Sequence, residues 1–155
     1  LRKEITDLLL QDFGYSQKKA DDSLQKMFGG KPYKDLTKEG QAHYDKRKHR
    51  QEAFESWFIA YQRDTIMDCI RKATEYIFSA NSIYPSSMDE LAERRMFQNR
   101  AIGQCYRLLQ ELQYAVEILP VNINKYARFV EGIEREIRLL RGWRKRDNKF
   151  KKGIL

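Results

Sequence analysis

Residues that interrupt helices are scarce in this sequence. Only 3 prolines and 8 glycines occur among its 155 residues, and these two residue types disfavour helix most strongly. Long stretches that lack both are therefore predicted to be helical. No apolar run approaches the roughly 20 residues that a membrane-spanning helix needs, and no signal peptide is visible. We expect a soluble, cytoplasmic protein with no membrane partner; the chain starts at Leu1, which leaves the native N-terminus open.

Residues that carry catalysis or hold metals are scarce as well. The two cysteines, Cys69 and Cys105, lie among apolar residues without a histidine close in sequence, which predicts buried thiols. The two histidines, His43 and His49, are six positions apart and do not share a helix face well. The sequence also lacks a glycine-rich phosphate loop and a nucleophile elbow. We therefore expect no catalytic residue, no metal ion and no cofactor, and we predict that the protein is not an enzyme.

What the sequence does contain is apolar residues at helical spacing. In the first long segment, Thr37 is the predicted N-cap, and the helix is expected to run to about residue 80. The part before Arg50 is almost entirely polar. The predicted apolar stripe of the rest consists of Phe54, Phe58, Tyr61, Thr65, Cys69, Ala73 and Ile77, widened by Trp57, Ile59, Ile66 and Ile70. Steps of three and four residues predict an amphipathic helix.

Two further long segments follow the same rule. Ser87 and Glu90 form a predicted capping box at the start of the second, and Pro120 is expected to end it. Asn122 or Asn124 is the predicted cap of the third. The apolar stripes are Ile102, Cys105, Leu109, Leu112, Val116 and Leu119 in the second, and Tyr126, Val130, Ile133, Ile137 and Leu140 in the third. Such stripes must be buried against one another, which predicts an antiparallel helical bundle.

The predicted fold class is all-α, an antiparallel four-helix bundle with a small N-terminal helical appendage. Residues 1–36 are expected to form a helical hairpin and linker, residues 37–147 the bundle, and residues 148–155 a basic tail. The hairpin is predicted from Ile5, Leu8, Leu9 and Phe13, a break at Gly14, a cap at Ser16, and Ala20, Leu24, Met27 and Phe28. Residues 37–50, residues 1–28 or a neighbouring copy could supply the fourth helix of the bundle, and the sequence leaves this choice open.

Positive charge is the most informative feature for function. The formal net charge is +8, and the cations are clustered. The candidate nucleic-acid-binding residues are Lys46, Arg47, Lys48, Arg50, Arg94, Arg95, Arg138, Arg141, Arg144, Lys145, Arg146 and Lys149. Lysine and arginine supply phosphate contacts, whereas the alternative interpretation is a solvated face with a frayed basic tail. The helix dipole favours cations at a C-terminus and disfavours them at a start, so Arg94 and Arg95 hint at a partner.

Aromatic residues also lie among the C-terminal cations. Trp143 and Phe150 are interleaved with them, and such aromatic rings can stack on unpaired bases. Trp143 lies nearer to the apolar stripe, which favours a role in closing the end of the bundle. The surplus of aromatic residues in a short chain also makes self-association plausible.

The C-terminal half resembles a known family. The residues that carry the resemblance are Arg94-Arg95, Gln98, Ala101-Ile102, Cys105, Leu108-Leu109, the break at Pro120, and the closing Leu139-Leu140-Arg141-Gly142-Trp143-Arg144-Lys145. Over roughly residues 53–147 they resemble the Avd family, the accessory variability determinants of diversity-generating retroelements. These are related to the four-helix bundles encoded in ribosomal RNA intervening sequences. Residues 1–50 have no counterpart in that family.

The resemblance implies a non-catalytic, basic homopentamer of four-helix bundles, encoded by a bacterium or a phage. It also implies two partners, namely the reverse transcriptase and the template RNA whose mutagenic copying the protein supports. The charge pattern by itself predicts binding of RNA and single-stranded DNA with little sequence preference. Two alternatives stay open. The protein could be a stand-alone nucleic-acid-binding or phage regulatory protein, or an adaptor whose cations dock onto an acidic protein surface.

Overall fold

The computed structural model describes residues 1–10, 17–119, 121 and 123–154, and in this part of the chain every regular element is a helix. The order of elements is α1 (Arg2–Leu10), α2 (Gln17–Met27), η2 (Tyr33–Asp35), α3 (Lys38–Ser82), α4 (Met88–Ile118), η3 (Ile123–Lys125), α5 (Ala127–Arg146) and α6 (Lys149–Ile154). The predicted all-α class is therefore confirmed. The roles predicted for Phe13, Gly14, Ser16, Pro120 and Asn122 lie outside the described residues.

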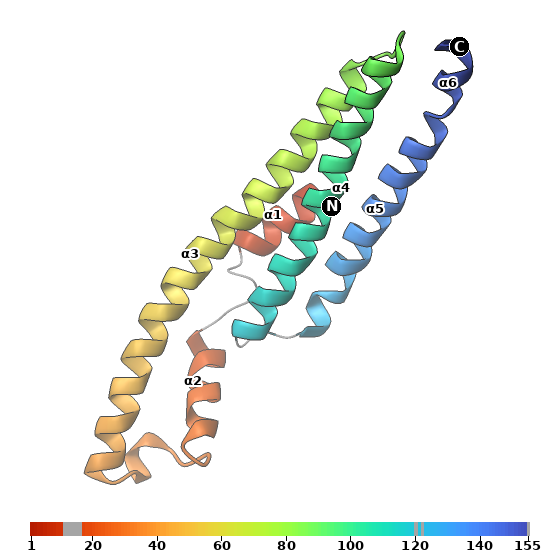
Figure 1. The fold of residues 1–155 in the computed structure, drawn as a ribbon. Helices are drawn as coiled ribbons and strands as arrows, with labels where there is room; N and C mark the ends of the chain where they lie inside the picture. Colours follow the sequence, from red (N-terminus) through yellow and green to blue (C-terminus); the bar gives the residue numbers. More distant parts are fainter. Residues whose placement is uncertain (11–16, 120, 122, 155) are drawn as a thin grey trace.

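Three long helices run lengthwise through the molecule, with α4 between α3 and α5 (Figure 1). Successive helices run in opposite directions (Figure 1). Helix α3 has 45 residues, or roughly 68 Å at 1.5 Å per residue, and α4 has 31 residues, or roughly 46 Å. The start of α3 therefore extends beyond α4 and α5. Residues 37–50 do not form a separate helix, because they belong to this continuous α3 or to its cap.

The caps explain where two of the long helices begin. The Thr37 hydroxyl accepts a hydrogen bond from the Gly40 amide at 3.1 Å, and the Ser87 hydroxyl accepts one from the Glu90 amide at 3.2 Å. The Glu90 carboxylate accepts from the amide and hydroxyl of Ser86, both at 2.7 Å. Both predicted caps are confirmed, with Ser86 in place of Ser87 as the reciprocal donor. The N-cap of α5 is Tyr126, which has no side-chain cap bond, so the predicted asparagine cap is not found there.

The core lies between α3, α4 and α5. Its buried members include Phe58, Ile66, Leu112, Ile133 and Ile137, as their spacing predicts. The prediction was wrong for one part of the α3 stripe, because its first aromatic residues face solvent. The exposed fractions are 46% for Phe54, 60% for Trp57 and 53% for Tyr61. The neighbouring Phe58 and Gln62 contact Tyr114 and Glu111 of α4, so the three exposed aromatic residues lie on a face of α3 that α4 does not cover.

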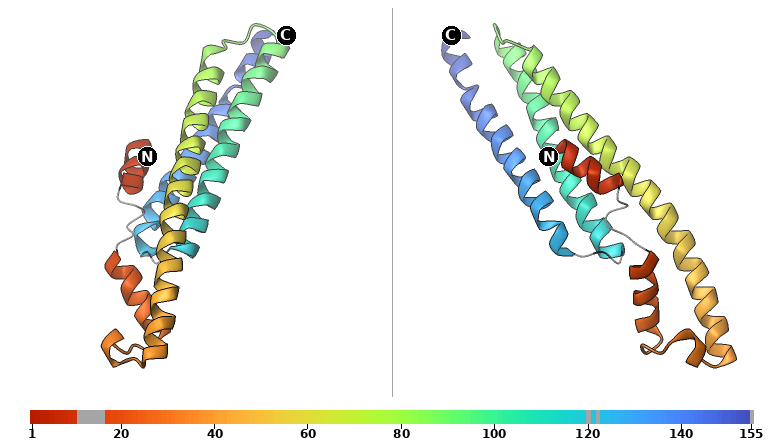
Figure 2. Two further views of the ribbon diagram at one scale, coloured as in Figure 1. Left: turned by 90° about the vertical axis from the view of Figure 1, so that its left-hand side faces the viewer. Right: turned by 180° about the vertical axis from the view of Figure 1, so that it is seen from behind.

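The N-terminal helices were predicted to form a hairpin of their own. In the structure they pack separately against α3. Helix α1 lies against the middle of α3 (Figures 1 and 2), and its Ile5, Leu8 and Leu9 are members of the main core. Helix α2 instead lies beside the extending start of α3 (Figures 1 and 2). Ala20 and Leu24 of α2 are buried outside the main core cluster. The two short helices therefore pack against different stretches of α3.

The linker after α2 is anchored to the start of α3. Gly29 and Gly30 have φ angles of 75° and 73°, a left-handed conformation that favours glycine. The Tyr33 hydroxyl then donates to Asp45 at 2.8 Å. The Tyr44 ring lies 5.2 Å from the rings of Phe28 and of Tyr33. Aromatic contacts and a hydrogen bond therefore hold the linker and the end of α2 on α3.

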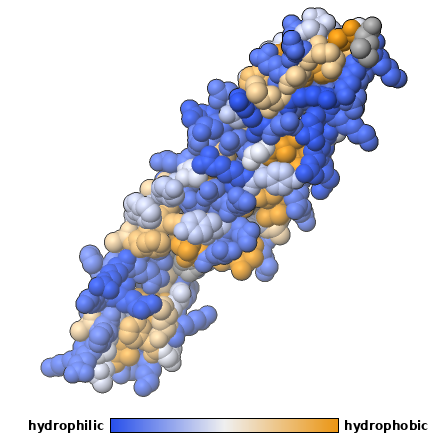
Figure 3. Space-filling view, in the orientation of Figure 1, coloured by the Kyte–Doolittle hydropathy of each residue, from blue (hydrophilic) through white to orange (hydrophobic). Residues whose placement is uncertain are grey.

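Hydrophilic side chains cover most of the face drawn in Figure 3, and apolar patches interrupt it near mid-length and over α2. Within the described residues, no helix is long and apolar enough to cross a membrane.

Candidate nucleic-acid interface

A basic groove lies between α4 and α5. It has a volume of about 550 Å³. Its lining residues are Arg95 and Asn99 of α4, Arg141, Arg144 and Lys145 of α5, and Asn148 in the turn before α6. The lining thus contains four cations, two neutral amides and no carboxylate. Four of the cations predicted to bind nucleic acid are brought together here from positions about 50 residues apart in sequence.

Helical geometry places these residues at the edge of the core. On α4, Arg95 and Asn99 are one turn apart and directly follow the buried Arg94 and Gln98. On α5, Arg141 directly follows the buried Leu140, and Arg144 and Lys145 lie one helical turn after Leu140 and Arg141. Residues from both helices thus line the groove between them.

Neutral side chains orient the guanidinium groups of the groove. Arg95 donates to the side-chain oxygen of Asn148, and Arg144 donates to that of Asn99. Arg141 donates to the hydroxyl of Tyr106, and its guanidinium carbon lies 5.6 Å from the centroid of that ring. A neutral acceptor fixes the direction of an arginine without neutralising its charge. Among the described residues, the three groove arginines have no ion-pair partner, and the planar fork of donors on a guanidinium matches two oxygens of a phosphate.

Asn99, Asn148 and Tyr106 were missed by reasoning from the sequence. Asparagine and tyrosine carry no charge, so they do not appear in a search for basic clusters. The one available signal was the spacing of Asn99, which lies one helical turn after Arg95 and thus on the same face. Contacts across two helices, such as Arg144 with Asn99, cannot be read from either helix alone.

Arg94 was predicted to bind nucleic acid, but the structure places its side chain in an interior network. Its side chain is 8% exposed, and it forms an ion pair with Asp147, whose side chain is 3% exposed. The Nε and Nη2 atoms of Arg94 donate to the two carboxylate oxygens at 2.7 and 3.3 Å. Gln98 donates to the same carboxylate at 2.6 Å. A cation committed to this interior network is not available to an external phosphate.

Arg94 also closes the end of α3. Its Nη1 atom donates to the backbone oxygens of Ala80 at 3.0 Å and Ile83 at 2.7 Å. These carbonyls belong to the last turn and C-cap of α3, where backbone acceptors have no helical partner. The cost of a cation near the start of α4 is thus offset at the C-terminus of the neighbouring helix. The unfavourable dipole position has a structural explanation and does not require a partner.

The two aromatic residues among the C-terminal cations also serve packing. The Arg94 guanidinium lies 5.0 Å from the ring centroid of Trp143 and 5.6 Å from that of Phe150. Phe150 makes a further edge contact with Tyr84, at 5.2 Å between centroids. Phe150 belongs to α6, so residues 149–154 are a short helix packed near α4 and not the tail that was predicted.

The other predicted site residues lie outside the groove. Arg138, Arg146 and Lys149 are exposed, and the Lys149 amine lies 5.1 Å from the centroid of Phe150. Lys48 on α3 forms ion pairs with Asp21 at 3.7 Å and with Glu52 at 4.0 Å. Its cation is therefore partly neutralised.

The remaining predicted cations are Lys46, Arg47 and Arg50. These three residues line a different pocket, of about 700 Å³, between α2 and the start of α3. The structure thus separates the twelve predicted cations into four that line the groove, three that line this second pocket, the buried Arg94, and four that lie outside both pockets.

The two cysteines, which are the candidate nucleophiles, lie inside the fold. Cys69 and Cys105 are both buried, and burial raises the pKa of the Cys105 thiol to about 11 and raises that of Cys69 as well. At neutral pH both are protonated and poorly nucleophilic. Within the described part of the chain, no group of three or more histidine, cysteine, aspartate or glutamate residues is arranged to hold a metal ion.

The chain matches no family model, no curated protein and no solved structure.

Proposed function

We propose that this protein binds nucleic acid without catalysing a reaction, and that the groove between α4 and α5 contacts the phosphate backbone. The observation that carries the proposal is the convergence of Arg95, Arg141, Arg144 and Lys145 on one groove whose lining has no carboxylate. Cations that repel one another are costly to gather, and an anionic ligand relieves that cost. Phosphate contacts do not read bases, so binding shows little sequence preference.

The biological partner in this proposal comes from the sequence. Residues 53–147 resemble the Avd family, and we propose that the bound nucleic acid is the template RNA of a diversity-generating retroelement. The second partner is then its reverse transcriptase, with the protein serving as an accessory to mutagenic copying. The groove supports the RNA-binding part of this proposal. An acidic protein surface as the partner of the same groove is the alternative that the experiment below separates.

Self-association is part of the proposal. An apolar pocket of about 730 Å³ lies between α4 and α5 near η3, and its lining includes Leu109, Val116, Ile123 and Val130. An apolar groove of this kind is suited to receiving a helix from a second copy. We propose that such a helix completes a four-helix bundle, with the pentamer as the expected assembly. Light scattering over a dilution series tests this, and a monomer mass up to tens of micromolar would contradict it.

The groove is tested with the triple variant Arg141→Gln, Arg144→Gln and Lys145→Gln. Titration of labelled RNA at several salt concentrations is the measurement. Each lost phosphate contact should reduce the slope of log affinity against log salt by roughly 0.7 to 0.9, and affinity should fall at every concentration. An unchanged slope with an intact fold would refute the groove as the site. Binding to an acidic protein but not to RNA would favour the adaptor.

A matched control separates local contact from net charge. Arg2, Lys3 and Lys18 are exposed cations on α1 and α2, and changing all three to glutamine removes the same three charges. Both triple variants lower the formal net charge from +8 to +5, that is 8 − 3. If the groove is the site, only the groove variant should lose most of its affinity. Equal losses in both variants would indicate a general charge effect.

A further inference from the structure

One face of α3 carries a second set of exposed residues that the groove does not include. His43, Arg47, Arg50, Phe54, Trp57 and Tyr61 follow one another at steps of four and three residues. This spacing places all six on one helix face, and all six are exposed. The first half of the face is cationic and the second half is aromatic.

The aromatic half is a stack of rings open to solvent. The rings of Trp57 and Tyr61 are 5.4 Å apart at an interplanar angle of 15°. Phe54 lies 6.0 Å from Trp57, and 5.7 Å from the buried Phe58 at 19°. The stack is thus attached to the core through Phe58, and its outer rings, Trp57 and Tyr61, are 60% and 53% exposed. Large exposed aromatic surface is costly to hydrate, and a contiguous patch of it indicates a binding surface.

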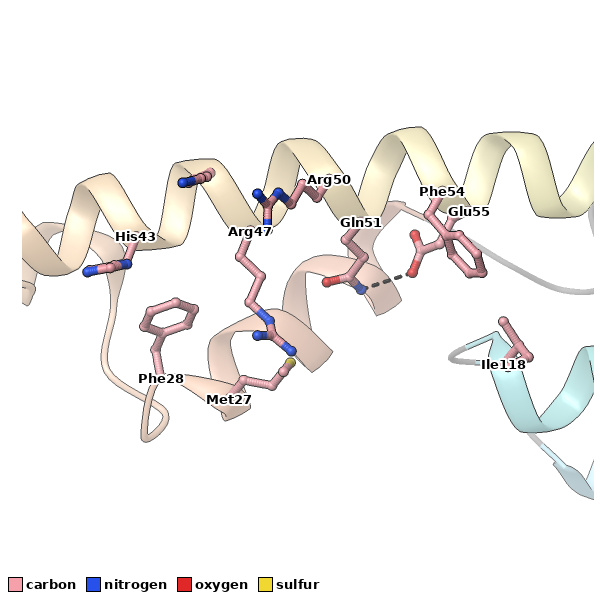
Figure 4. A pocket seen from close by; sticks show the side chains of 10 residues that line it. Met27, Phe28, His43, Arg47, Arg50, Gln51, Phe54, Glu55 and Ile118 are labelled. Atoms are coloured by element: carbon pink, nitrogen blue, oxygen red, sulfur yellow. Dashed lines mark hydrogen bonds between the residues drawn. The ribbon is translucent and has the colours of Figure 1, made fainter.

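The cationic half lines the pocket between α2 and α3. Figure 4 shows the Arg47 side chain pointing from α3 toward Met27 and Phe28, while Ile118 at the end of α4 lies on the other side of the opening. Lys46 and Arg50 also line it. Within the described residues, these three cations have no ion-pair partner.

One carboxylate lies in the wall of this pocket. It belongs to Glu55, which is 4% exposed and accepts a hydrogen bond from Gln51 at 2.9 Å (Figure 4). Phe54 lines the same pocket, so the cations and the aromatic stack form one continuous surface, here called the α3 platform.

We propose that the α3 platform binds unpaired nucleic acid, with bases stacked on Trp57 and Tyr61 and phosphates held by Arg47, Arg50 and Lys46. This inference rests on the proposed nucleic-acid function and adds a second site that selects single strands. Stacking on aromatic rings requires bases with free faces, which a duplex does not offer. Adjacent cations make the ligand an anion, and an uncharged apolar partner would leave them unpaired. The groove, in contrast, has only cations and amides and accepts either form.

The test compares single-stranded and duplex oligonucleotides of one sequence by fluorescence anisotropy. Trp57→Ala with Tyr61→Ala should weaken binding of the single strand roughly 10-fold or more, and should change duplex binding less than twofold. Phe78→Ala is the control, because Phe78 is a 71% exposed aromatic residue further along the same helix, and it should change neither. Trp57→Phe with Tyr61→Phe should restore single-strand binding, because both rings can still stack.

Each result has one meaning. If the wild-type protein binds neither oligonucleotide, the proposed function itself fails. If it binds both and the double alanine variant leaves single-strand binding unchanged, or weakens both forms equally, the α3 platform is not a single-strand site. If that variant instead turns an oligomer into a monomer in light scattering while single-strand affinity is retained, the platform is an interface between copies, and the inference is wrong.

Discussion

Arg94 and Arg95 are neighbours in the sequence, yet the first faces the interior network and the second faces the basic groove. Arg94 has a carboxylate, two backbone carbonyls and two aromatic rings around it, so its charge is compensated within the fold. Arg95 has only the neutral side chain of Asn148 as its recorded acceptor. The comparison teaches that a cation's partner, and not its presence in a basic cluster, separates a structural role from a binding role.

Removing the interior partner should have the largest effect. Asp147→Ala leaves the Arg94 guanidinium buried without its counter-ion, and loss of one partner of a buried pair costs about 3–5 kcal/mol. Urea denaturation measures this loss in the free energy of unfolding. Asn148→Ala, at the next position and exposed, should cost no more than about 0.5 kcal/mol. If both variants lose the same free energy of unfolding, the distinction between the interior network and the groove is wrong.

The same contrast between neighbours should hold in the middle of α4. Leu112 is 1% exposed, and Leu112→Ala should destabilise the fold by about 2–5 kcal/mol through lost burial and a cavity. Gln113 is exposed and donates to Glu117 within its own helix. Gln113→Ala should change the unfolding free energy by no more than about 0.5 kcal/mol. If thermal or urea unfolding gives the same cost for both, the assigned helix phase is wrong.

A smaller effect on stability is expected from the groove. The variant with glutamine at Arg141, Arg144 and Lys145 loses hydrogen bonds only to exposed partners, so each change should alter the unfolding free energy by roughly 0.5 kcal/mol or less. Like-charge repulsion among the groove cations falls at the same time, which offsets part of the loss. Circular dichroism against temperature is the measurement. A severe fall in Tm would mean that the groove cations are structural, as Arg94 is.

No effect at all is expected when thiol reagents are added to the folded protein. The pKa of Cys105 is raised to about 11 by burial, so raising the pH from 7 to 9 leaves this thiol protonated in the folded state. An unfolded thiol, with a pKa near 8.5, becomes largely ionised over the same range. Alkylation followed by mass spectrometry should therefore detect modification only in denaturant. Rapid labelling of the native protein at pH 8 would contradict the burial of both cysteines.

Local signals in the sequence were sufficient to predict the long helices and two of their N-caps. Thr37 and Ser87 are strong N-cap residues, and each starts a helix within one residue of the predicted position. Most residues of the α4 and α5 stripes are buried because these helices pack against each other and against α3, whereas Leu109, Val116 and Val130 line the open apolar pocket. Phe54, Trp57 and Tyr61 have the same spacing but are exposed, whereas Phe58 and Gln62 of the same stretch contact Tyr114 and Glu111 of α4. Periodicity indicates which residues share a face, whereas the position of the neighbouring helix decides which face is covered.

The site was only partly predictable for a related reason. Clusters of lysine and arginine indicated Arg95, Arg141, Arg144 and Lys145, but no local pattern distinguished Arg94 from them. Its partner Asp147 is 53 residues away in the sequence. Asp147 is the C-cap residue of α5 and directly precedes the turn into α6, where a tail was predicted. An ion pair between two residues far apart in the sequence leaves no periodic pattern, so it cannot be predicted from residue spacing.

The uninterrupted length of α3 sets the distance between the α3 platform and the basic groove. Tyr76 of α3 contacts Phe97, which lies between the groove residues Arg95 and Asn99. From Trp57 to Tyr76 the helix rises over 19 residues, 76 − 57, or about 29 Å. At roughly 3.4 Å per nucleotide, the spacing along one strand of B-DNA, this rise corresponds to about nine nucleotides. If both proposed sites bind the same strand, the second contact becomes intramolecular, and the strand binds more tightly than at either site alone.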